Sequence, residues 1–389
     1  MVEICSIGSL LERKRTKAKD KYHNVPVYAV TNNRGFVLSS SLHDFDIFSD
    51  DTSNYMVVSK NDFAYNPSRL NVGSIAYFKE EGNGLISPMY VVFHADENKI
   101  LAEYLYIVIK SEFVRNKIDA LKEVGARFRF DFNRWGLIKI PIPSLEEQTR
   151  IVGILDTFTS AIDNLKEQIA QRRKQYEYYR DQLFYVSKAD LLDASNKGEV
   201  IVKYLDELGT FTRGRRFVRT DIVPEGVPCI HYGDMYTYYG ISAEETPTHL
   251  TKELSSKLRF AKTGDVVIVA AGENDLDIGV GVAWLGKEPV VVHDACFIYE
   301  HKMVPKYVSH FMRSRNYHQQ IRMGVVDGKI CSISAKELGR ALIAVPSLQE
   351  QQRIVSILDT FEASIQNLEA QLKEREKQYE YYRNKLLTF

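Results

Sequence analysis

One stretch of this sequence occurs twice: PSLEEQTRIVGILDTFTSAIDNLKEQIAQRRKQYEYYRDQLFYV at Pro143–Val186 and PSLQEQQRIVSILDTFEASIQNLEAQLKEREKQYEYYRNKLLTF at Pro346–Phe389. About 26 of the 44 aligned positions are identical, which a shared composition does not produce. Similarity of this extent indicates an internally duplicated architecture, in which each copy forms the same structural element.

Each copy predicts one long helix. Ser144 stands three residues before Glu147, and the second copy repeats this capping-box pattern of a helix start. No proline interrupts either copy afterwards. About 40 helical residues at a rise of about 1.5 Å give a rod of roughly 60 Å, which is longer than a compact core requires.

Apolar residues recur in both copies at alternating steps of four and three, which is the pattern of a coiled-coil seam. Because the chain returns between the copies, we expect the two rods to pair with each other in antiparallel fashion. Each seam contains an arginine at the same step, which could fix the register or extend its stem out of the seam. The predicted helix-pair seam consists of Ile151, Leu155, Phe158, Ile162, Leu165, Ile169, Arg172, Ile354, Leu358, Phe361, Ile365, Leu368, Leu372 and Arg375.

The two helices divide the chain into four predicted segments: a first head at 1–142, a helix at 143–186, a second head at 187–345 and a helix at 346–389. Both heads contain many short apolar stretches that predict strands, so we expect an α/β (mixed α+β) fold. The heads occupy equivalent places but differ in sequence. This contrast indicates one shared scaffold with two different recognition surfaces.

The composition limits the class of protein. With 51 basic and 51 acidic residues the net charge is zero, which excludes a nonspecific polycation but allows a local basic face. Without a long apolar run or a secretory signal, we expect a cytoplasmic protein with no membrane partner. The four cysteines are widely spaced and lack the pattern of a metal site, so we expect thiols and no bound metal.

Each head begins with an apolar strand and continues into a basic cluster. One charge run is more often a solvated face than a site, but two at matching places favour a function. Such side chains suit phosphate contacts, and the arginines could also contact guanine edges. The candidate DNA-binding residues of the two clusters are Arg13, Lys14, Arg15, Lys17, Lys19 and Lys21, and Arg213, Arg215, Arg216 and Arg219.

Polar and aromatic segments in each head supply further candidates for DNA contact. Any single member is more often a loop-packing residue than a base contact, so the prediction concerns the set. The candidates are Tyr65, Asn66, Ser68 and Arg69 in the first head and His231, Tyr232, Asp234 and Tyr236 in the second.

Motifs of catalysis are missing from the sequence. We find no Walker A lysine motif, and Gly279, Gly281 and Gly286 lack the spacing of a dinucleotide-binding loop. The Asn-Pro-Ser at 66–68 lacks the second proline and the aromatic residue of the Asn-Pro-Pro-Tyr loop of adenine methyltransferases. We therefore predict no catalytic residue in this chain.

The segments IPIPSLEEQTRIVGILD and IAVPSLQEQQRIVSILD, each between a variable head and a long helix, resemble the specificity subunit of type I restriction-modification enzymes. The resemblance extends over essentially the whole chain. YNPSRLNVGSIAYFKEEGNGLISPMYVVF, at Tyr65–Phe93, is similar to a target-recognition domain motif of that family. The resemblance implies that each head reads one half of a bipartite, asymmetric double-stranded DNA target, and that the helix pair sets the spacer.

The resemblance also implies partners. Two methyltransferase subunits would dock on the helices and heads, and restriction subunits would join the full complex. S-adenosylmethionine, ATP and Mg would be bound by those partners, which would carry out adenine-N6 methylation and ATP-dependent cleavage, while this chain binds no cofactor. Some family members have terminal extensions that close a circular arrangement. None follows the second helix here, so we expect the helix pair to do more of that work.

Two other classes of function remain open at this point. One is a non-catalytic coiled-coil scaffold whose heads bind proteins or carbohydrates. The salt dependence of binding would discriminate, because contacts with several phosphates weaken steeply as salt rises. The other is a nuclease or methyltransferase fused to a DNA reader, which the missing motifs disfavour.

Overall fold

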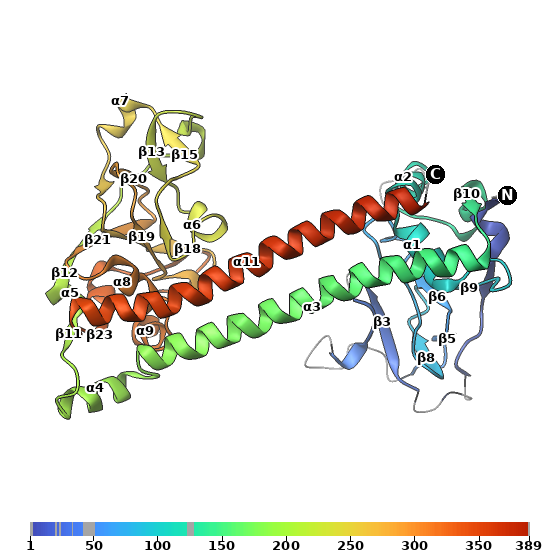
Figure 1. Cartoon of the computed structure of the whole chain (residues 1–389), viewed down its shortest axis with the longest axis horizontal. Coiled ribbons are helices and arrows are strands. Elements are labelled where there is room, and N and C mark those ends of the chain that lie inside the picture. The colour runs from blue at the N-terminus through green and yellow to red at the C-terminus, as the bar shows by residue number, and fades with distance from the viewer. Residues whose placement is uncertain are drawn as a thin grey trace. The chain divides into compact units, whose positions relative to one another are not determined.

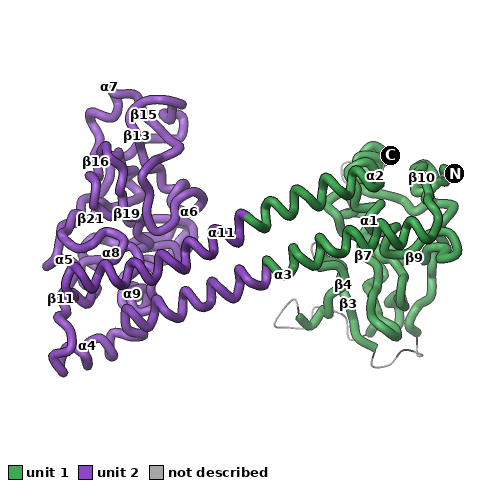
Figure 2. Tube along the Cα trace, in the orientation of Figure 1, with its two compact units in different colours: residues 1–165, 371–389 green, residues 166–370 purple. Residues whose placement is uncertain are grey.

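The computed structural model describes residues 3–19, 22, 25–32, 34–41, 51–122 and 128–387. The chain forms two compact units, one of residues 1–165 with 371–389 and one of residues 166–370 (Figure 2). Each unit contains one head and a part of both long helices. The α/β duplication predicted from the sequence is therefore confirmed.

The long helices are α3, Leu145–Leu183, and α11, Leu348–Leu387 (Figure 1). Both begin after a serine cap: the hydroxyl of Ser144 accepts a hydrogen bond from the backbone N–H of Glu147 at 3.3 Å, and Ser347 does the same for Glu350 at 3.2 Å. This cap satisfies one of the backbone donors that a helix start leaves without a partner.

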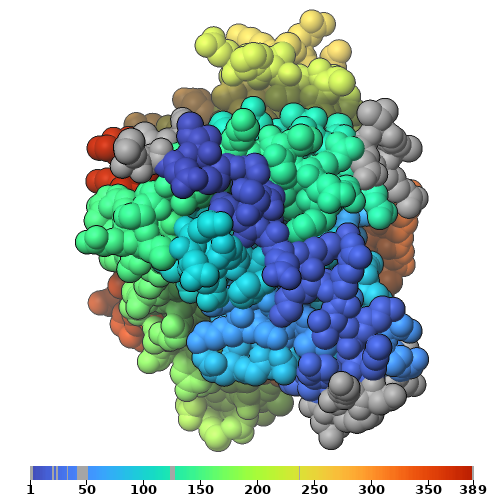
Figure 3. All heavy atoms as spheres, turned by 90° about the vertical axis from the view of Figure 1, so that its right-hand side faces the viewer, coloured from blue at the N-terminus to red at the C-terminus, as the bar shows by residue number. Residues whose placement is uncertain are grey.

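The first head contains two four-stranded sheets. One is antiparallel throughout, with strand order β2-β9-β6-β7: Leu11–Lys14, Val91–Ala95, Phe63–Tyr65 and Ile75–Tyr77. The other has the order β4-β3-β8-β5: Gly35–Leu38, Val27–Thr31, Asn83–Ile86 and Met56–Ser59. Figure 3 shows atoms of the first residues of the chain (blue) beside later residues of the first head (light blue), which agrees with the pairing of β3 with β8. The remaining elements are β1 Glu3–Ser6 paired with β10 Lys139–Ile142, α1 Ala102–Lys110, α2 Glu112–Ala120, and the 3-10 turns η1 Ile7–Leu10, η3 Ser39–Ser41 and η4 Phe132–Leu137.

The second head also contains two main sheets. The larger has the order β12-β21-β17-β19-β14: Gly209–Arg213, Cys296–His301, Val266–Val269, Gly281–Trp284 and Ser242–Ala243. The smaller has the order β15-β13-β20-β16: Thr248–Leu250, Val227–Ile230, Val290–Val292 and Phe260–Ala261. The other strands are β11 Val202–Tyr204 paired with β23 Leu342–Ala344, and β18 Ala271–Gly272 paired with β22 Cys331–Ser332.

The second head also contains short helices. They are α4 Lys188–Asn196, α5 Leu205–Leu208, α6 Asp234–Thr237, α7 Lys252–Ser255, α8 Pro305–Phe311, α9 Arg315–Ile321 and α10 Ala335–Gly339, with the 3-10 turns η5 Arg219–Asp221, η6 Asp275–Asp277 and η7 Arg322–Gly324.

The two heads share one plan of strand connection despite their different sequences. The run β2-β9-β6-β7 corresponds to β12-β21-β17-β19. The other main sheet of each head contains one parallel pair, β3 with β8 and β13 with β20. The match extends to a turn with positive φ, at Asn61 (66°) and Gly264 (100°). The next residue in each case is a buried aspartate, Asp62 or Asp265, that accepts a backbone hydrogen bond at 2.8 or 2.7 Å.

A buried glutamine attaches the start of each long helix to its head. In unit 1 the Gln148 amide accepts from Leu101 N–H and donates to the carbonyls of Lys99 and Pro143, each at 2.9 Å. In unit 2 the Gln351 amide accepts from Val304 N–H and donates to the Pro346 carbonyl, again at 2.9 Å. Both glutamines are almost fully buried, so these bonds fix where each helix leaves its head.

In unit 1 the first half of α3 lies beside the end of α11. The rings of Phe158 and Tyr382 stack with centroids 5.2 Å apart, and the guanidinium of Arg375 lies 5.9 Å from the Phe158 ring. In unit 2 the roles are exchanged: Tyr179 stacks on Phe361 at 5.4 Å, and Arg172 lies 5.9 Å from that ring. The helices therefore run in opposite directions within each unit, which confirms the antiparallel prediction.

Both seam arginines lie against the partner helix and also reach outward. Each donates a hydrogen bond to the glutamine three residues later, Arg172 to Gln175 at 3.1 Å and Arg375 to Gln378 at 3.0 Å. A guanidinium over an aromatic face is attracted to it. Both readings of the arginine thus apply: it contacts a specific ring across the seam, and its head group remains at the surface.

The apolar cores lie inside the heads and include the helix ends. The core of unit 1 contains Ile151 and Leu155 of α3 together with Leu387 of α11. The core of unit 2 contains Tyr176 of α3 and Leu358 of α11. All four cysteines are free thiols. Of the helices in the described ranges, none has both the length and the apolar character needed to cross a bilayer.

Candidate nucleic-acid interface

The basic cluster of the first head begins on the edge strand β2 and continues beyond it. Arg13, Arg15, Lys17 and Lys19 are exposed. The guanidinium of Arg13 lies 5.9 Å from the Phe132 ring, and Lys17 donates to the side chain of Asn54 at 3.1 Å. These contacts restrain the side chains of Arg13 and Lys17, and their charged groups remain at the surface. Lys21 lies outside the described residues.

Lys14 has a different environment from its neighbours. Its ammonium lies 2.5 Å from a carboxylate oxygen of Asp62, a residue with no exposed surface. The other Asp62 oxygen lies 3.0 Å from Nδ1 of His94. A buried carboxylate needs such partners, because an unpaired buried charge is costly. Lys14 therefore neutralises Asp62, and the prediction that it contacts DNA does not fit this geometry.

The second set of candidates in the first head forms the turn between β6 and β7. Asn66 shapes the turn: its side-chain oxygen accepts from Ser68 N–H at 2.9 Å, and its carbonyl accepts from Arg69 N–H at 3.0 Å. Ser68 and Arg69 are exposed. They remain available for DNA contact.

The prediction that Tyr65 contacts DNA is wrong. It is fully buried, and its hydroxyl donates to the carbonyl of Phe130 at 3.2 Å. Burial raises the pKa of this hydroxyl far above its usual range. The ring packs edge-on against Phe130 and Trp135, so Tyr65 belongs to the core and has no surface to offer to DNA.

The strand register brings the basic cluster and the turn to one edge of the sheet. Lys14 lies opposite Val92 and Tyr65 opposite Val91, so β2 and β6 end at the same edge. Arg15 and Asn66 are the next residues along each strand. Asn66 also lies 3.9 Å from the sulfur of Met89, a residue that is 59% exposed. This edge is the candidate interface of the first head.

In the second head the arginine cluster lies at the end of β12 and in the loop that follows. The guanidinium of Arg213 donates to the Asp294 carbonyl and that of Arg215 to the Lys257 carbonyl, each at 2.8 Å. Both side chains are exposed but help to shape the loop. Arg216 and Arg219 are exposed as well, and neither makes a side-chain hydrogen bond within the described part of the chain.

The structure brings this loop against the second predicted set. His231 lies 5.9 Å from the Phe217 ring and 4.7 Å from Tyr232, measured between centroids. His293 lies 5.0 Å from Phe217 and 4.9 Å from His231. We call Phe217, His231, Tyr232 and His293 the aromatic cluster. The sequence analysis missed Phe217 and His293, although His293 directly follows an apolar strand, as His231 does.

Asp234 supports the loop of the aromatic cluster. It begins α6, and its carboxylate accepts from the Thr248 hydroxyl at 3.1 Å. This bond and its partial burial favour a structural role over direct contact with DNA. The side chain of Tyr236 lies outside the described part of the chain.

Burial favours the neutral form of both histidines of the aromatic cluster. Burial is the main cause that lowers the pKa of His231, and Arg219 acts in the same direction against Asp234. Burial likewise lowers the pKa of His293, with His231 and Arg216 adding to the effect and Asp294 opposing it. Neutral imidazoles offer one donor and one acceptor each.

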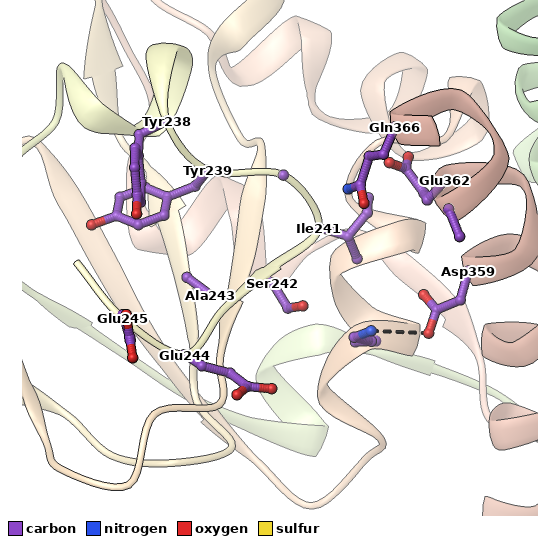
Figure 4. Close-up of a pocket in the computed structure, with 13 residues that line it drawn as sticks. Tyr238, Tyr239, Ile241, Ser242, Ala243, Glu244, Glu245, Asp359, Glu362 and Gln366 are labelled. Atoms are coloured by element: carbon purple, nitrogen blue, oxygen red, sulfur yellow. Dashed lines mark hydrogen bonds and ion pairs between the residues drawn. The ribbon is translucent and has the colours of Figure 1, made fainter. Parts of the chain in front are cut away.

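A hollow of about 610 Å³ lies elsewhere in unit 2, between the Tyr238–Glu245 segment and α11 (Figure 4). Glu244, Glu245 and Glu362 line it, and Asp359 pairs with Lys306 at 2.9 Å. Excess carboxylates repel phosphate, so this hollow is a poor surface for DNA. No group of His, Cys, Asp and Glu suited to a metal ion occurs among the described residues.

Comparison with known proteins agrees with this arrangement. The family model of the type I restriction modification DNA specificity domain matches residues 1–172 and 198–376. The EcoR124I/EcoR124II specificity subunit of Escherichia coli is 29% identical over 393 residues, which cover 96% of this chain and 89% of that protein. The specificity subunit of the MjaVIII type I restriction enzyme of Methanocaldococcus jannaschii is 24% identical, over 87% of this chain and 80% of its own length.

Two solved structures share the fold. A chain from a study of complex assembly and conformational transition of the type I R-M system superposes with a TM-score of 0.59 at 17% identity, covering 99% of this chain and 97% of that one. The S subunit of M. genitalium superposes with a TM-score of 0.57 at 16% identity, covering 100% and 96%.

Lys14 and Arg15 provide a matched test of the interface. Lys14→Gln leaves the buried Asp62 carboxylate without its cation, so we expect a loss of about 1–3 kcal/mol in the free energy of unfolding and an unchanged salt dependence of DNA binding. Arg15→Gln should leave stability within about 0.5 kcal/mol and lower the slope of log affinity against log salt by about one. Denaturant unfolding and binding titrations measure both. A loss of salt slope in Lys14→Gln without a loss of stability would show that Lys14 contacts phosphate.

Proposed function

The chain belongs to the family of type I restriction-modification DNA specificity subunits, and on that basis we propose that each head reads one half of a bipartite, asymmetric double-stranded target. Members of this family supply sequence specificity and leave catalysis to partner subunits, so the chain is a non-catalytic subunit. The match to this family also disfavours the scaffold with protein- or carbohydrate-binding heads.

The observation that carries the proposal is one plan of strand connection presenting two different loop surfaces. In each head, exposed basic residues follow the first strand of the matching run of strands: Arg15 follows β2 in the first head, and Arg216 follows β12 in the second. The neighbouring loops differ: the first head has the turn at Asn66, and the second has the aromatic cluster. Two heads with the same strand connections but different loops suit two half-targets that differ in sequence. Basic residues beside these loops can contact phosphates while the loops contact bases.

We propose that the subunit assembles with modification and restriction subunits and with DNA. In support, one relative is named as the specificity subunit of a type I restriction enzyme, and one solved structure comes from a study of complex assembly of the type I R-M system. In finer detail, we propose two modification subunits per chain, with restriction subunits joining the full complex. S-adenosylmethionine, ATP and Mg would be bound by these partners, where adenine-N6 methylation and ATP-dependent cleavage take place. Since the proposed function is to bind DNA together with these partners, we propose that the subunit acts in the cytoplasm.

The heptapeptide KQYEYYR, present in both helices at 174–180 and 377–383, supports two copies of one partner. Its last tyrosine, Tyr179 or Tyr382, stacks across the helix pair. Its middle tyrosine, Tyr178 or Tyr381, is 61% or 60% exposed. Two matched surfaces with an exposed aromatic residue fit two copies of one partner, since exposed tyrosines are frequent anchors of protein interfaces.

An exchange of heads tests the proposed reading of half-targets. When residues 1–142 are replaced by the corresponding head of another specificity subunit, we expect one half of the target to change while the other half and the spacer remain. Mapping of methylated adenines in cells that contain the chain and its modification partner gives the target directly. A change in both halves would contradict the modular reading.

The exposed tyrosines can be tested separately. Tyr178→Ala or Tyr381→Ala should each weaken binding of one modification subunit by about tenfold or more, and the double variant should weaken both. Native mass spectrometry counts the bound copies, and Tyr204→Ala, at an exposed tyrosine of the second head, is the control. Unchanged stoichiometry and affinity in the double variant would exclude this surface.

A further inference from the structure

The reading surface of the second head can be resolved to one side chain. We propose, resting on the DNA-reading function above, that His231 contacts a base edge in the major groove through its Nε2–H. The base would present a hydrogen-bond acceptor: N7 of a purine, O6 of guanine or O4 of thymine. His293 is the positioning residue that holds the imidazole of His231, and Arg216 and Arg219 contact neighbouring phosphates.

Strand geometry places the two histidines together. β13 and β20 are parallel neighbours with Ile230 opposite Val292. His231 and His293 are the residues that directly follow these strands, so both leave the same end of the sheet. The backbone N–H of His293 donates to the carbonyl of Ile230 at 3.2 Å, and the two rings lie 4.9 Å apart. Loops at the end of paired parallel strands are a common place for ligand contact.

Local hydrogen bonds select the tautomer of His231. The backbone N–H of Gly233 donates to its Nδ1 at 3.2 Å, so Nδ1 is an acceptor and the proton of the neutral ring is on Nε2. Nε2 has no partner within the described part of the chain, and it is not among the buried side-chain atoms that lack one. His231 therefore presents a single donor at the surface. Such a donor fits the acceptors named above and opposes the amino group of cytosine.

Both ring nitrogens of His293 make hydrogen bonds within the protein. Its Nδ1 accepts from Ala295 N–H at 3.1 Å, which puts the proton on Nε2, and Nε2 donates to the carbonyl of Phe217 at 3.0 Å. The ring thus joins the Arg216 loop to the loop after β20 while packing against His231. It cannot reach a base without breaking these bonds, so its role is to position the surface.

The charges around the histidines favour an anionic ligand. Arg216 and Arg219 are exposed, whereas two of the nearby carboxylates are held by the protein. Asp221 accepts from Val218 N–H at 2.8 Å, and Asp234 accepts from the Thr248 hydroxyl at 3.1 Å. Cations that face solvent beside a neutral donor are the combination that phosphate contact and base reading require.

The first head has no histidine at the matching places. There the parallel strands β3 and β8 pair with Tyr28 opposite Ile86, and the next residues are Ala29 and Ser87. The donor is therefore particular to the second head. Changes at His231 should affect only the half-target that this head reads.

Competition binding with the complex of the full chain and its modification subunit tests the proposal. The DNA is the mapped target and a set of duplexes in which each base of both halves is replaced in turn. His231→Ala should reduce the discrimination against cytosine at one position of the second half by about tenfold, the worth of one hydrogen bond. His231→Gln keeps an amide donor and should retain part of the discrimination.

Arg219→Gln provides the contrast. It should weaken binding to all duplexes equally and lower the salt slope by about one. Assembly with the modification subunit and thermal unfolding show whether each variant is folded. If His231→Ala does not fold, the base preferences of His231→Gln still test the proposal. Unchanged base preferences in both His231 variants, or a changed preference in the first half, would overturn the inference. If the unaltered complex showed no sequence preference at all, the proposed function itself would fail.

Discussion

The antiparallel pairing of α3 with α11 is the constraint on which the rest of the structure depends. Each helix starts at a buried glutamine of one head, and its far end packs into the core of the other unit: Leu387 of α11 in unit 1 and Phe184, directly after α3, in unit 2. Neither core is complete without both helices. Phe158 of α3 lies beside Arg375 of α11, and Phe361 of α11 lies beside Arg172 of α3. The two helices therefore make equivalent contacts in the two units. This equivalence accounts for the presence of the same aromatic and arginine residues at matching positions of the two copies.

The heads use the opposite strategy. Their strand connections agree, including the aspartate that follows a positive-φ turn in each, but the residues at the loop edges do not. The first head offers Ser68 and Arg69 next to an exposed Met89, and the second offers neutral imidazoles next to arginines. Because the loops contribute little to the core, their residues can differ between the heads while the strand connections stay the same. Such a division suits a subunit that must present two different surfaces on one scaffold.

The sequence predicted the two long helices and their antiparallel direction, because these depend on local periodicity and on a visible repeat. It did not predict which candidates face inward. Tyr65 is buried by Phe130 and Trp135, far along the chain, and Lys14 is held by Asp62. The matching topology of the heads was equally hidden, since strand order depends on long-range pairing. The position of His293 directly after an apolar strand was a signal too weak to single it out, because many core residues share it.

We propose that the helix pair sets the spacing of the two half-targets, and a change in the length of both helices together tests this proposal. Insertion of one heptad after Leu165 and one after Leu368 keeps the seam and adds about 10 Å of helix, the rise of about three base pairs. Assembly with the modification subunit controls for folding, and mapping of methylated adenines gives the target. The account predicts that both half-sequences are kept and that the original spacer is replaced by one altered by about three base pairs. Full methylation of the original target with its spacer unchanged would contradict it.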